Sequence, residues 1–184
     1  RKNGTLQFDN YSDTWCDQSF SFSNGAVYAD LDNDGDLDIV VNNIDDPAFI
    51  YKNLSVEKKS GHYLQAKLHG SPANPFAVGA SVLIEYQDQK QYQELNPSRG
   101  IFSSVEHLIH FGTGDVTSID QLSVRWPDGK FQVMNNVSVD QRLQLNWSDA
   151  SGSVAHLVPP AKAENTLFAE KDAAKNGLTF HHLE

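Results

Sequence analysis

The chain lacks the residues needed for disulfide cross-links and for strong binding to polyanions. Its only cysteine, Cys16, excludes an internal disulfide framework and cannot by itself form a zinc site. Lysine and arginine number 14 against 24 aspartates and glutamates, which gives a formal net charge of −10. Because nucleic-acid affinity depends largely on basic side chains that neutralise phosphates, RNA binding is disfavoured. No apolar run approaches the roughly 18 residues that a membrane-spanning helix requires.

Common catalytic motifs are also missing. The sequence contains no His-Glu-x-x-His, no Gly-x-Ser-x-Gly and no glycine-rich phosphate loop. A pair of carboxylates that act on glycosidic bonds stays open as an alternative, because any two of the 24 acidic residues can meet in space. Because the common catalytic motifs are missing, we expect a protein without catalytic activity.

What the chain does contain is a run of alternating aspartates. Residues 30–38 read DLDNDGDLD, so the carboxylates repel one another unless a cation lies among them. Ca²⁺ takes six to eight oxygen ligands at roughly 2.3–2.6 Å, supplied by carboxylates, carbonyls and water. Gly35 stands at the sixth position, where such a loop has to turn sharply. The spacing predicts a calcium site whose ligands come from Asp30, Asp32, Asp34, Asp36 and Asp38.

The flanks of this loop distinguish it from an EF-hand. An EF-hand requires a bidentate glutamate at position 12 and a helix on each side, whereas position 12 here is Val41. Residues 26–29 and 37–41 are apolar, aromatic and β-branched, which favours strands. We therefore predict a calcium loop inside a β-hairpin. The alternatives are an acidic, solvated turn and a Mg²⁺ site.

Short alternating segments dominate the middle of the chain. Leu64, Ala66 and Leu68 share one face of a predicted strand, and Gln65 and Lys67 share the other. Nothing between residues 56 and 147 has a convincing helical period. The pattern predicts an all-β fold, an antiparallel sandwich or barrel. The predicted strands are 63–68, 80–86, 91–95, 108–111, 121–126, 131–134 and 141–145.

Two stretches resemble known families. Residues 23–43, with the acidic loop at their centre, look like the VCBS/FG-GAP repeat, a blade of integrin-α-like β-propellers that carries a calcium loop between two strands. The following segment resembles the ASPIC/UnbV domain of cartilage acidic protein-like and bacterial surface proteins. The second resemblance is carried by residues 79–82 (GASV), 98–100 (SRG), 110–114 (HFGTG) and 125–130 (RWPDGK).

The resemblances imply a domain organisation. We expect a partial propeller blade with its calcium-loop hairpin over residues 1–55, packed on an ASPIC/UnbV sandwich-like domain over 60–147. Residues 148–184 then form a linker and the start of a following repeat. Neither end has a targeting motif, and both begin or stop within a strand pattern. This favours a fragment of a longer protein, in which neighbouring blades contact residues 1–55.

The resemblances also imply a function. The propeller motif implies that the five loop aspartates bind calcium, and members of these families suggest an extracytoplasmic location, at the cell surface, secreted or periplasmic. We expect a non-catalytic interaction or adhesion module in which Ca²⁺ is structural and the partner is a protein. The alternative is a glycan-capturing or carbohydrate-active surface protein. It rests on Phe20, Phe22, Tyr28, Phe49 and Tyr51, for which packing inside a blade is the simpler interpretation.

Several other residues have simpler structural explanations. Residues 125–129 (RWPDG) are typical of a strand that ends at proline and turns at Asp-Gly, although a ligand-facing tryptophan is the alternative. Arg99 has no second basic group with which to bind an anion. His107 and His110 are three apart in a predicted strand, so their side chains point to opposite faces and cannot share a metal.

Overall fold

The computed structural model describes residues 10, 14 and 20–153. Between residues 20 and 153 the chain is all-β, as predicted, with one short 3₁₀ turn, η1 (Trp147–Asp149). Cys16 lies outside the described residues, as does the predicted start of a further repeat. Within the described part, no helix has the length and hydrophobicity needed to span a membrane.

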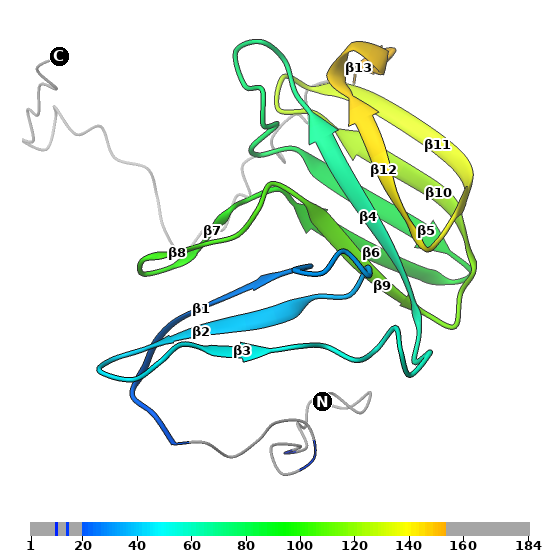
Figure 1. The fold of residues 1–184 in the computed structure, drawn as a ribbon. Coiled ribbons are helices and arrows are strands. Elements are labelled where there is room, and N and C mark those ends of the chain that lie inside the picture. Colours follow the sequence, from blue (N-terminus) through cyan, green and yellow to red (C-terminus); the bar gives the residue numbers. More distant parts are fainter. Residues whose placement is uncertain (1–9, 11–13, 15–19, 154–184) are drawn as a thin grey trace, which may run out of the picture. The chain divides into compact units, whose positions relative to one another are not determined.

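The acidic segment connects two strands of a small antiparallel sheet, as the sequence predicts. This sheet has the order β1-β2-β3 (Figure 1). Its strands are β1 (Ser23–Ala29), β2 (Asp38–Asn43) and β3 (Phe49–Tyr51). Val27 pairs with Val40 and Val40 pairs with Ile50, so β-branched residues stabilise the hairpin that holds the loop. Residues 30–37 lie in the connection between β1 and β2.

Two larger sheets follow, whose strands interleave along the sequence, and residues 98–104 form a short separate hairpin. The first sheet has the order β13-β11-β10-β5-β6 and the second the order β12-β4-β9. The strands of the first sheet are β5 (Ser81–Tyr86), β6 (Gln89–Glu94), β10 (Ser118–Arg125), β11 (Lys130–Ser138) and β13 (Gly152–Ser153). Those of the second are β4 (His62–His69), β9 (Ile109–Gly114) and β12 (Gln141–Asn146). The hairpin consists of β7 (Ser98–Gly100) and β8 (Ser103–Ser104).

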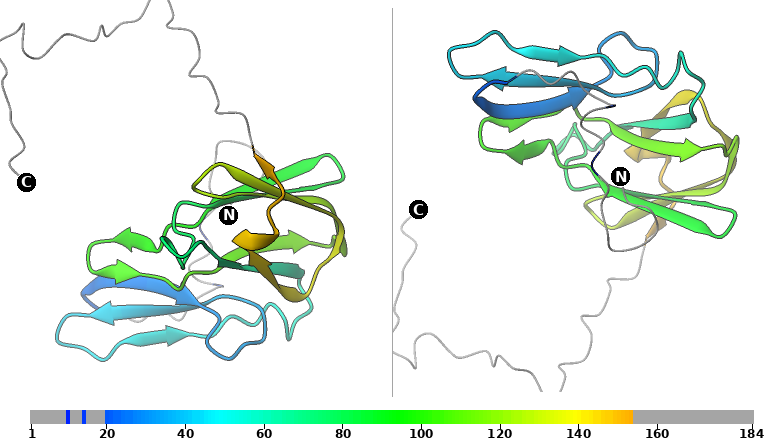
Figure 2. Two further views of the ribbon diagram at one scale, coloured as in Figure 1. Left: turned by 90° about the horizontal axis from the view of Figure 1, so that it is seen from above. Right: turned by 90° about the horizontal axis from the view of Figure 1, so that it is seen from below.

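The hydrophobic core lies between these two sheets. Figure 2 shows them as two layers, and they do not close into a barrel. The apolar face predicted for β4 is confirmed, because Leu64, Ala66 and Leu68 are all buried. On the opposite face Gln65 is buried as well, and Lys67 is half-buried. From the opposite sheet, side chains such as Val82 and Leu122 belong to the same cluster. Because one face of each sheet is apolar, packing the two faces together buries both.

One strand pair corrects the antiparallel prediction. β12 runs parallel to β4, with Gln141 opposite Leu64 and Asn146 opposite His69. The physical reason is the route of the chain. β12 is reached from β11 in the other sheet, so no tight hairpin imposes an antiparallel partner. β11 is also longer than predicted, because its polar residues Asn135 and Asn136 carry no hydrophobic signal although Asn135 pairs with Gln121 of β10.

The aromatic residues before β1 differ from the prediction. Phe20 is 98% exposed and Phe22 is 77% exposed, so neither has the packed role expected for them. Phe49 and Tyr51 on β3 are half-buried and contact each other edge-to-face, with ring centroids 6.0 Å apart. Tyr28 on β1 is 37% exposed, and the Arg99 guanidinium lies 5.5 Å from the centre of its ring. Packing within the three-stranded sheet therefore accounts for Phe49 and Tyr51 but not for Phe20 and Phe22.

Candidate cation site at the acidic loop

The loop between β1 and β2 has a backbone that only certain residues adopt easily. Asn33 and Gly35 both have positive φ, 59° and 104°. Asparagine and glycine tolerate this region better than other residues. Gly35 is needed for a second reason, because a Cβ there would lie 2.0 Å from the ring of Tyr63 on β4. The loop thus turns sharply and passes directly against Tyr63 of the β12-β4-β9 sheet.

Four of the five predicted ligands come together in two overlapping groups. Carboxylate oxygens of Asp30, Asp32 and Asp34 lie within 4.8 Å of one another, and so do those of Asp34, Asp36 and Glu57. Asp34 belongs to both groups. Carboxylate oxygens at this spacing are the donors that hard divalent cations prefer. The described residues therefore contain donors that could hold a metal ion.

Asp38 has a different environment from the other four. Its Oδ1 accepts a hydrogen bond from the backbone N–H of Asn53 (2.8 Å), and its Oδ2 accepts one from Leu31 N–H (3.1 Å). The carboxylate therefore ties the start of the loop to the segment that follows β3. Each of its oxygens keeps a second lone pair, so these bonds leave Asp38 able to ligate a cation.

Two buried oxygens at the loop lack the partners that burial requires. Asp30 is 8% exposed and Asp36 is 6% exposed, and within the described part the Oδ1 atom of each has no hydrogen-bond partner. Burial raises the pKa of Asp36, with a further contribution from the charges of Asp34 and Asp38. A buried carboxylate oxygen without a partner is unfavourable. A cation ligated by these oxygens would remove that cost, so the donor set fits a hard divalent ion.

An ammonium group lies among the same carboxylates. Lys52 Nζ is 2.6 Å from Asp32 Oδ2, 2.7 Å from Glu57 Oε1 and 3.8 Å from Asp34 Oδ2. The hydrogen bond from Lys52 lowers the pKa of both Asp32 and Glu57. The carboxylates in turn raise the pKa of Lys52. Lys52 thus contributes positive charge at the point where the two carboxylate groups meet.

Lys52 and Glu57 were not identified from the sequence. Lys52 follows β3 directly, and the pairing of Tyr51 with Ile39 places it beside the start of β2, next to the loop. Predicting that Lys52 lies beside the loop would have required knowledge of this strand register. Glu57 comes from the turns between β3 and β4, where no periodic pattern points to a neighbour.

The loop is attached to the β12-β4-β9 sheet through Asp30. Its Oδ2 accepts hydrogen bonds from Gln65 Nε2 on β4 (2.9 Å) and Arg142 Nη2 on β12 (3.4 Å). Gln65 is 1% exposed, and its Oε1 accepts a further bond from Arg142 Nε (2.6 Å). The Asp30 carboxylate therefore has one oxygen bound to β4 and β12, and its other oxygen has no hydrogen-bond partner among the residues that the structure describes.

A second attachment is made by the backbone of the loop. His110 Nε2 on β9 donates a hydrogen bond to the carbonyl oxygen of Gly35 (2.8 Å). The His110 ring also stacks on Tyr63, with the two planes inclined by 10°. His107 precedes β9, and its ring stacks on Phe76, with the ring centroids 4.6 Å apart. The loop therefore contacts all three strands of the β12-β4-β9 sheet.

Comparison with known proteins finds one family match within the chain. Residues 70–152 match the ASPIC and UnbV family. The match spans slightly less than half of the chain and includes β5 through β12. It confirms the ASPIC/UnbV resemblance and contains the Trp-Pro-Asp-Gly and Phe-Gly-x-Gly motifs on which that resemblance rested. The acidic loop lies outside the ASPIC/UnbV segment, and its likeness to a VCBS/FG-GAP repeat stays a prediction. No curated protein matches the chain significantly.

Proposed function

We propose that the chain is a non-catalytic, calcium-binding interaction module in which the ion is structural. The observation that supports this most strongly is a pair of buried oxygens, on Asp30 and Asp36, that have no hydrogen-bond partner among the described residues. Both belong to groups of carboxylates whose oxygens lie within 4.8 Å of one another. Ca²⁺ is favoured over Mg²⁺ because Mg²⁺ keeps most of its water and is seldom bound by protein oxygens alone.

The proposed ligands are the aspartates of the loop. Asp30, Asp32 and Asp34 supply side-chain oxygens, Asp36 supplies its side chain or its backbone carbonyl, and Asp38 supplies the remaining lone pairs of its carboxylate. Glu57 is an additional candidate, because its carboxylate groups with Asp34 and Asp36. Bound calcium would neutralise the mutual repulsion of these charges and so stabilise the hairpin.

The ion would also act on the connection between the hairpin and the ASPIC/UnbV segment. Asp30 touches Gln65 and Arg142 through one oxygen, and its other oxygen is available to the cation. A calcium ion that holds this carboxylate in place also holds the hydrogen bonds that it accepts from Gln65 and Arg142. We therefore propose that calcium sets how the hairpin is held against β4 and β12.

An extracytoplasmic location and a protein partner complete the proposal. Free calcium is millimolar outside cells, so even a weak site of this kind would be filled there. The surplus of acidic residues, 24 against 14 basic ones, disfavours a nucleic-acid partner. Neighbouring propeller blades are further proposed partners, supported by the exposed apolar residues Phe20, Phe22 and Ile50 next to or on the small sheet.

A calorimetric titration with CaCl₂ tests the metal site directly. We expect saturable binding to the wild-type chain and weaker binding of MgCl₂. Asp30→Asn should reduce calcium affinity at least about tenfold, because the amide offers one neutral oxygen in place of a charged carboxylate. Asp88→Asn is the matched control, since Asp88 is an exposed acid in the turn between β5 and β6. Titration of the wild type without measurable binding would rule the site out.

Replacing Lys52 should strengthen calcium binding. The Lys52 ammonium is bound to Asp32 and Glu57, so a cation at these carboxylates has to overcome its charge. We expect Lys52→Met to raise calcium affinity on the order of tenfold at low salt, and to lower the melting temperature in EDTA, where Lys52 is the cation that offsets the repulsion.

The control for this prediction is Lys90→Met. Lys90 forms an ion pair with Glu85 in the β5–β6 hairpin, and this pair is not part of the acidic loop. Its removal should leave calcium affinity unchanged. Weaker calcium binding by Lys52→Met would show that Lys52 supports the site rather than competing for it.

A further inference from the structure

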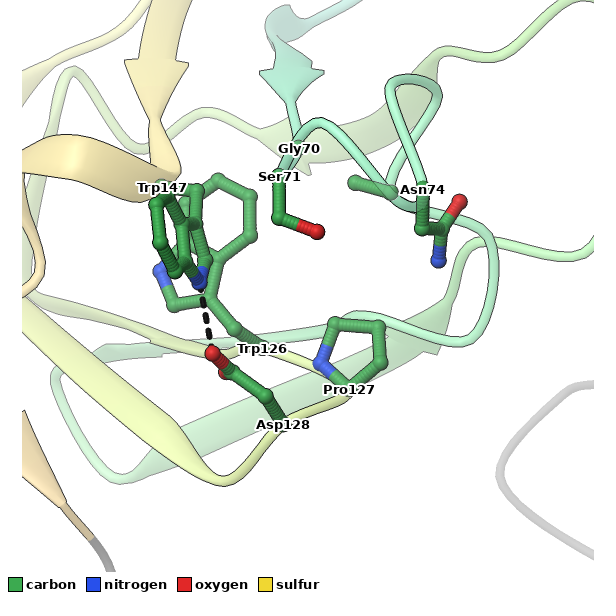
Figure 3. Close-up of a pocket in the computed structure, with 8 residues that line it drawn as sticks. Gly70, Ser71, Asn74, Trp126, Pro127, Asp128 and Trp147 are labelled. Carbon is green, nitrogen blue, oxygen red and sulfur yellow. Dashed lines mark hydrogen bonds between the residues drawn. The ribbon is translucent and has the colours of Figure 1, made fainter.

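The ASPIC/UnbV segment carries a pocket that is separate from the acidic loop. It lies where the turn after β4, the β10–β11 turn and η1 come together, and its volume is about 260 Å³ (Figure 3). Its walls are formed mainly by Ser71, Asn74, Trp126, Pro127, Asp128 and Trp147. Three of these residues belong to the Trp-Pro-Asp-Gly motif, which sequence reasoning interpreted as a turn.

Hydrogen bonds hold the walls of the pocket in place. Asn74 Oδ1 accepts from Val78 N–H (3.1 Å), and Asn74 Nδ2 donates to Val78 O (2.9 Å). Gly70 allows this turn to close, because a Cβ there would lie 2.0 Å from the Asn74 carbonyl oxygen. The pocket is therefore preformed on this side, which lowers the entropic cost of binding a ligand.

The opposite wall is held by Asp128. Its Oδ2 accepts a hydrogen bond from Trp147 Nε1 (2.7 Å), and its Oδ1 accepts one from Lys130 N–H (3.1 Å). The bond from Trp147 lowers the pKa of Asp128, which is therefore ionised at neutral pH. Each oxygen keeps a lone pair that can accept from a ligand.

The charges around the pocket select a neutral ligand. The Asp128 carboxylate disfavours anions. The Lys130 ammonium lies 3.4 Å from the centre of the Trp147 ring, so a cation already occupies a face of this ring. A second cation there would be repelled by Lys130. What the site offers is apolar surface from tryptophan and proline, together with a few fixed polar groups, as ligand pockets usually do.

We propose that this pocket binds a single neutral sugar ring. Figure 3 shows the Ser71 hydroxyl directed into the space between Trp126, Pro127 and Asn74, with the Asp128 carboxylate at the lower edge. The apolar face of the sugar would contact Trp147 and Pro127, and its hydroxyls would meet Ser71 and Asp128. A pocket of about 260 Å³ is smaller than the usual range for drug-sized ligands, which limits the occupant to one ring.

The test is a titration of the full chain followed by the indole N–H signals of its tryptophans in two-dimensional NMR. The probes are the methyl glycosides of glucose, galactose, mannose and N-acetylglucosamine, each in calcium and in EDTA. We expect at least one of them to shift the Trp147 signal saturably, with a dissociation constant of about 1 mM. The shift should be the same in calcium and EDTA, because the acidic loop is not part of this pocket.

Variants show whether the pocket is the binding site. Ser71→Ala and Asp128→Asn should each weaken binding about tenfold, the second because a hydrogen bond to a charged acceptor is lost. Tyr92→Ala, which removes an exposed aromatic ring on β6, is the control and should leave binding unchanged. A dispersed amide spectrum for each variant confirms that it is folded.

Several results would overturn the proposal. One is the absence of a saturable shift with all four glycosides, and another is binding that both pocket variants leave unchanged. A saturable shift with choline chloride but not with the sugars would assign the pocket to cations. A shift of equal size with glycerol would show a general affinity for polyols without sugar recognition.

Discussion

Moving the wild-type chain from excess calcium into EDTA is expected to lower its melting temperature by roughly 5 to 10 °C. A ligand that binds only the folded state stabilises it by about 2.7 kcal/mol when its concentration is a hundred times Kd. For a chain of this length, each 1 kcal/mol corresponds to about 2–4 °C in Tm. In EDTA the loop carboxylates repel one another, and Asp30 and Asp36 each keep a buried oxygen that has no partner in the described part of the chain. Differential scanning calorimetry in the two buffers measures the difference.

Two aspartate variants separate the metal from the local packing. Asp32→Ala removes a proposed calcium ligand, so it should abolish the difference in Tm between calcium and EDTA. Because Asp32 is exposed and bound only to Lys52 among the contacts described above, its removal should change the Tm in EDTA little. Asp30→Ala should abolish the same difference and also lower Tm in EDTA, because Gln65 and Arg142 lose their acceptor. Asp46→Ala, an exposed acid outside the loop, should keep the full difference. Identical wild-type curves in both buffers would refute a structural calcium ion.

Gly35→Ala is expected to damage both stability and calcium binding. A Cβ at this position would lie 2.0 Å from Cζ of Tyr63, and its φ of 104° is strained for any residue with a side chain. The backbone strain alone is worth about 1–3 kcal/mol. The clash adds to it, because moving the Tyr63 ring also disturbs its stacking on His110. Chemical denaturation and calcium titration of the variant measure the two losses.

Gly79→Ala is the matched control for this prediction. Gly79 also has a positive φ, 85°, but a Cβ there would meet no atom within 4 Å. The Gly79→Ala variant therefore measures the cost of the backbone strain without a steric clash. We expect Gly35→Ala to cost at least twice as much stability as Gly79→Ala, and we expect only Gly35→Ala to weaken calcium binding. Equal losses in the two variants would mean that the contact with Tyr63 is unimportant.

Local patterns predicted most of the strands. The alternation in residues 63–68 identified β4 and its buried face, because a strand places successive side chains on opposite sides and only one side is apolar. The same reasoning underestimated β11, whose asparagines pair with β10 without being apolar. It also could not distinguish a parallel from an antiparallel neighbour for β12, since the two give similar patterns along the strand itself.

The residues of the candidate site were likewise only partly predictable from the sequence. The aspartate spacing and Gly35 could be recognised from the sequence, because residues that are two apart in a tight turn necessarily lie close together. Lys52 and Glu57 could not be recognised, although Lys52 contacts two of the predicted ligands. Their position depends on how the segment after β3 returns to the loop.

The sequence alone determined the all-β class, the acidic hairpin loop and the need for glycine at its turn, since each depends on neighbours a few residues apart. The tertiary structure decided what each carboxylate touches. Asp30 meets Gln65 and Arg142, residues 35 and 112 positions away, and its other oxygen is buried with no partner from residues 20–153. Such contacts depend on strand order and register, which are set when the sheets pack together, and no short stretch of sequence contains them.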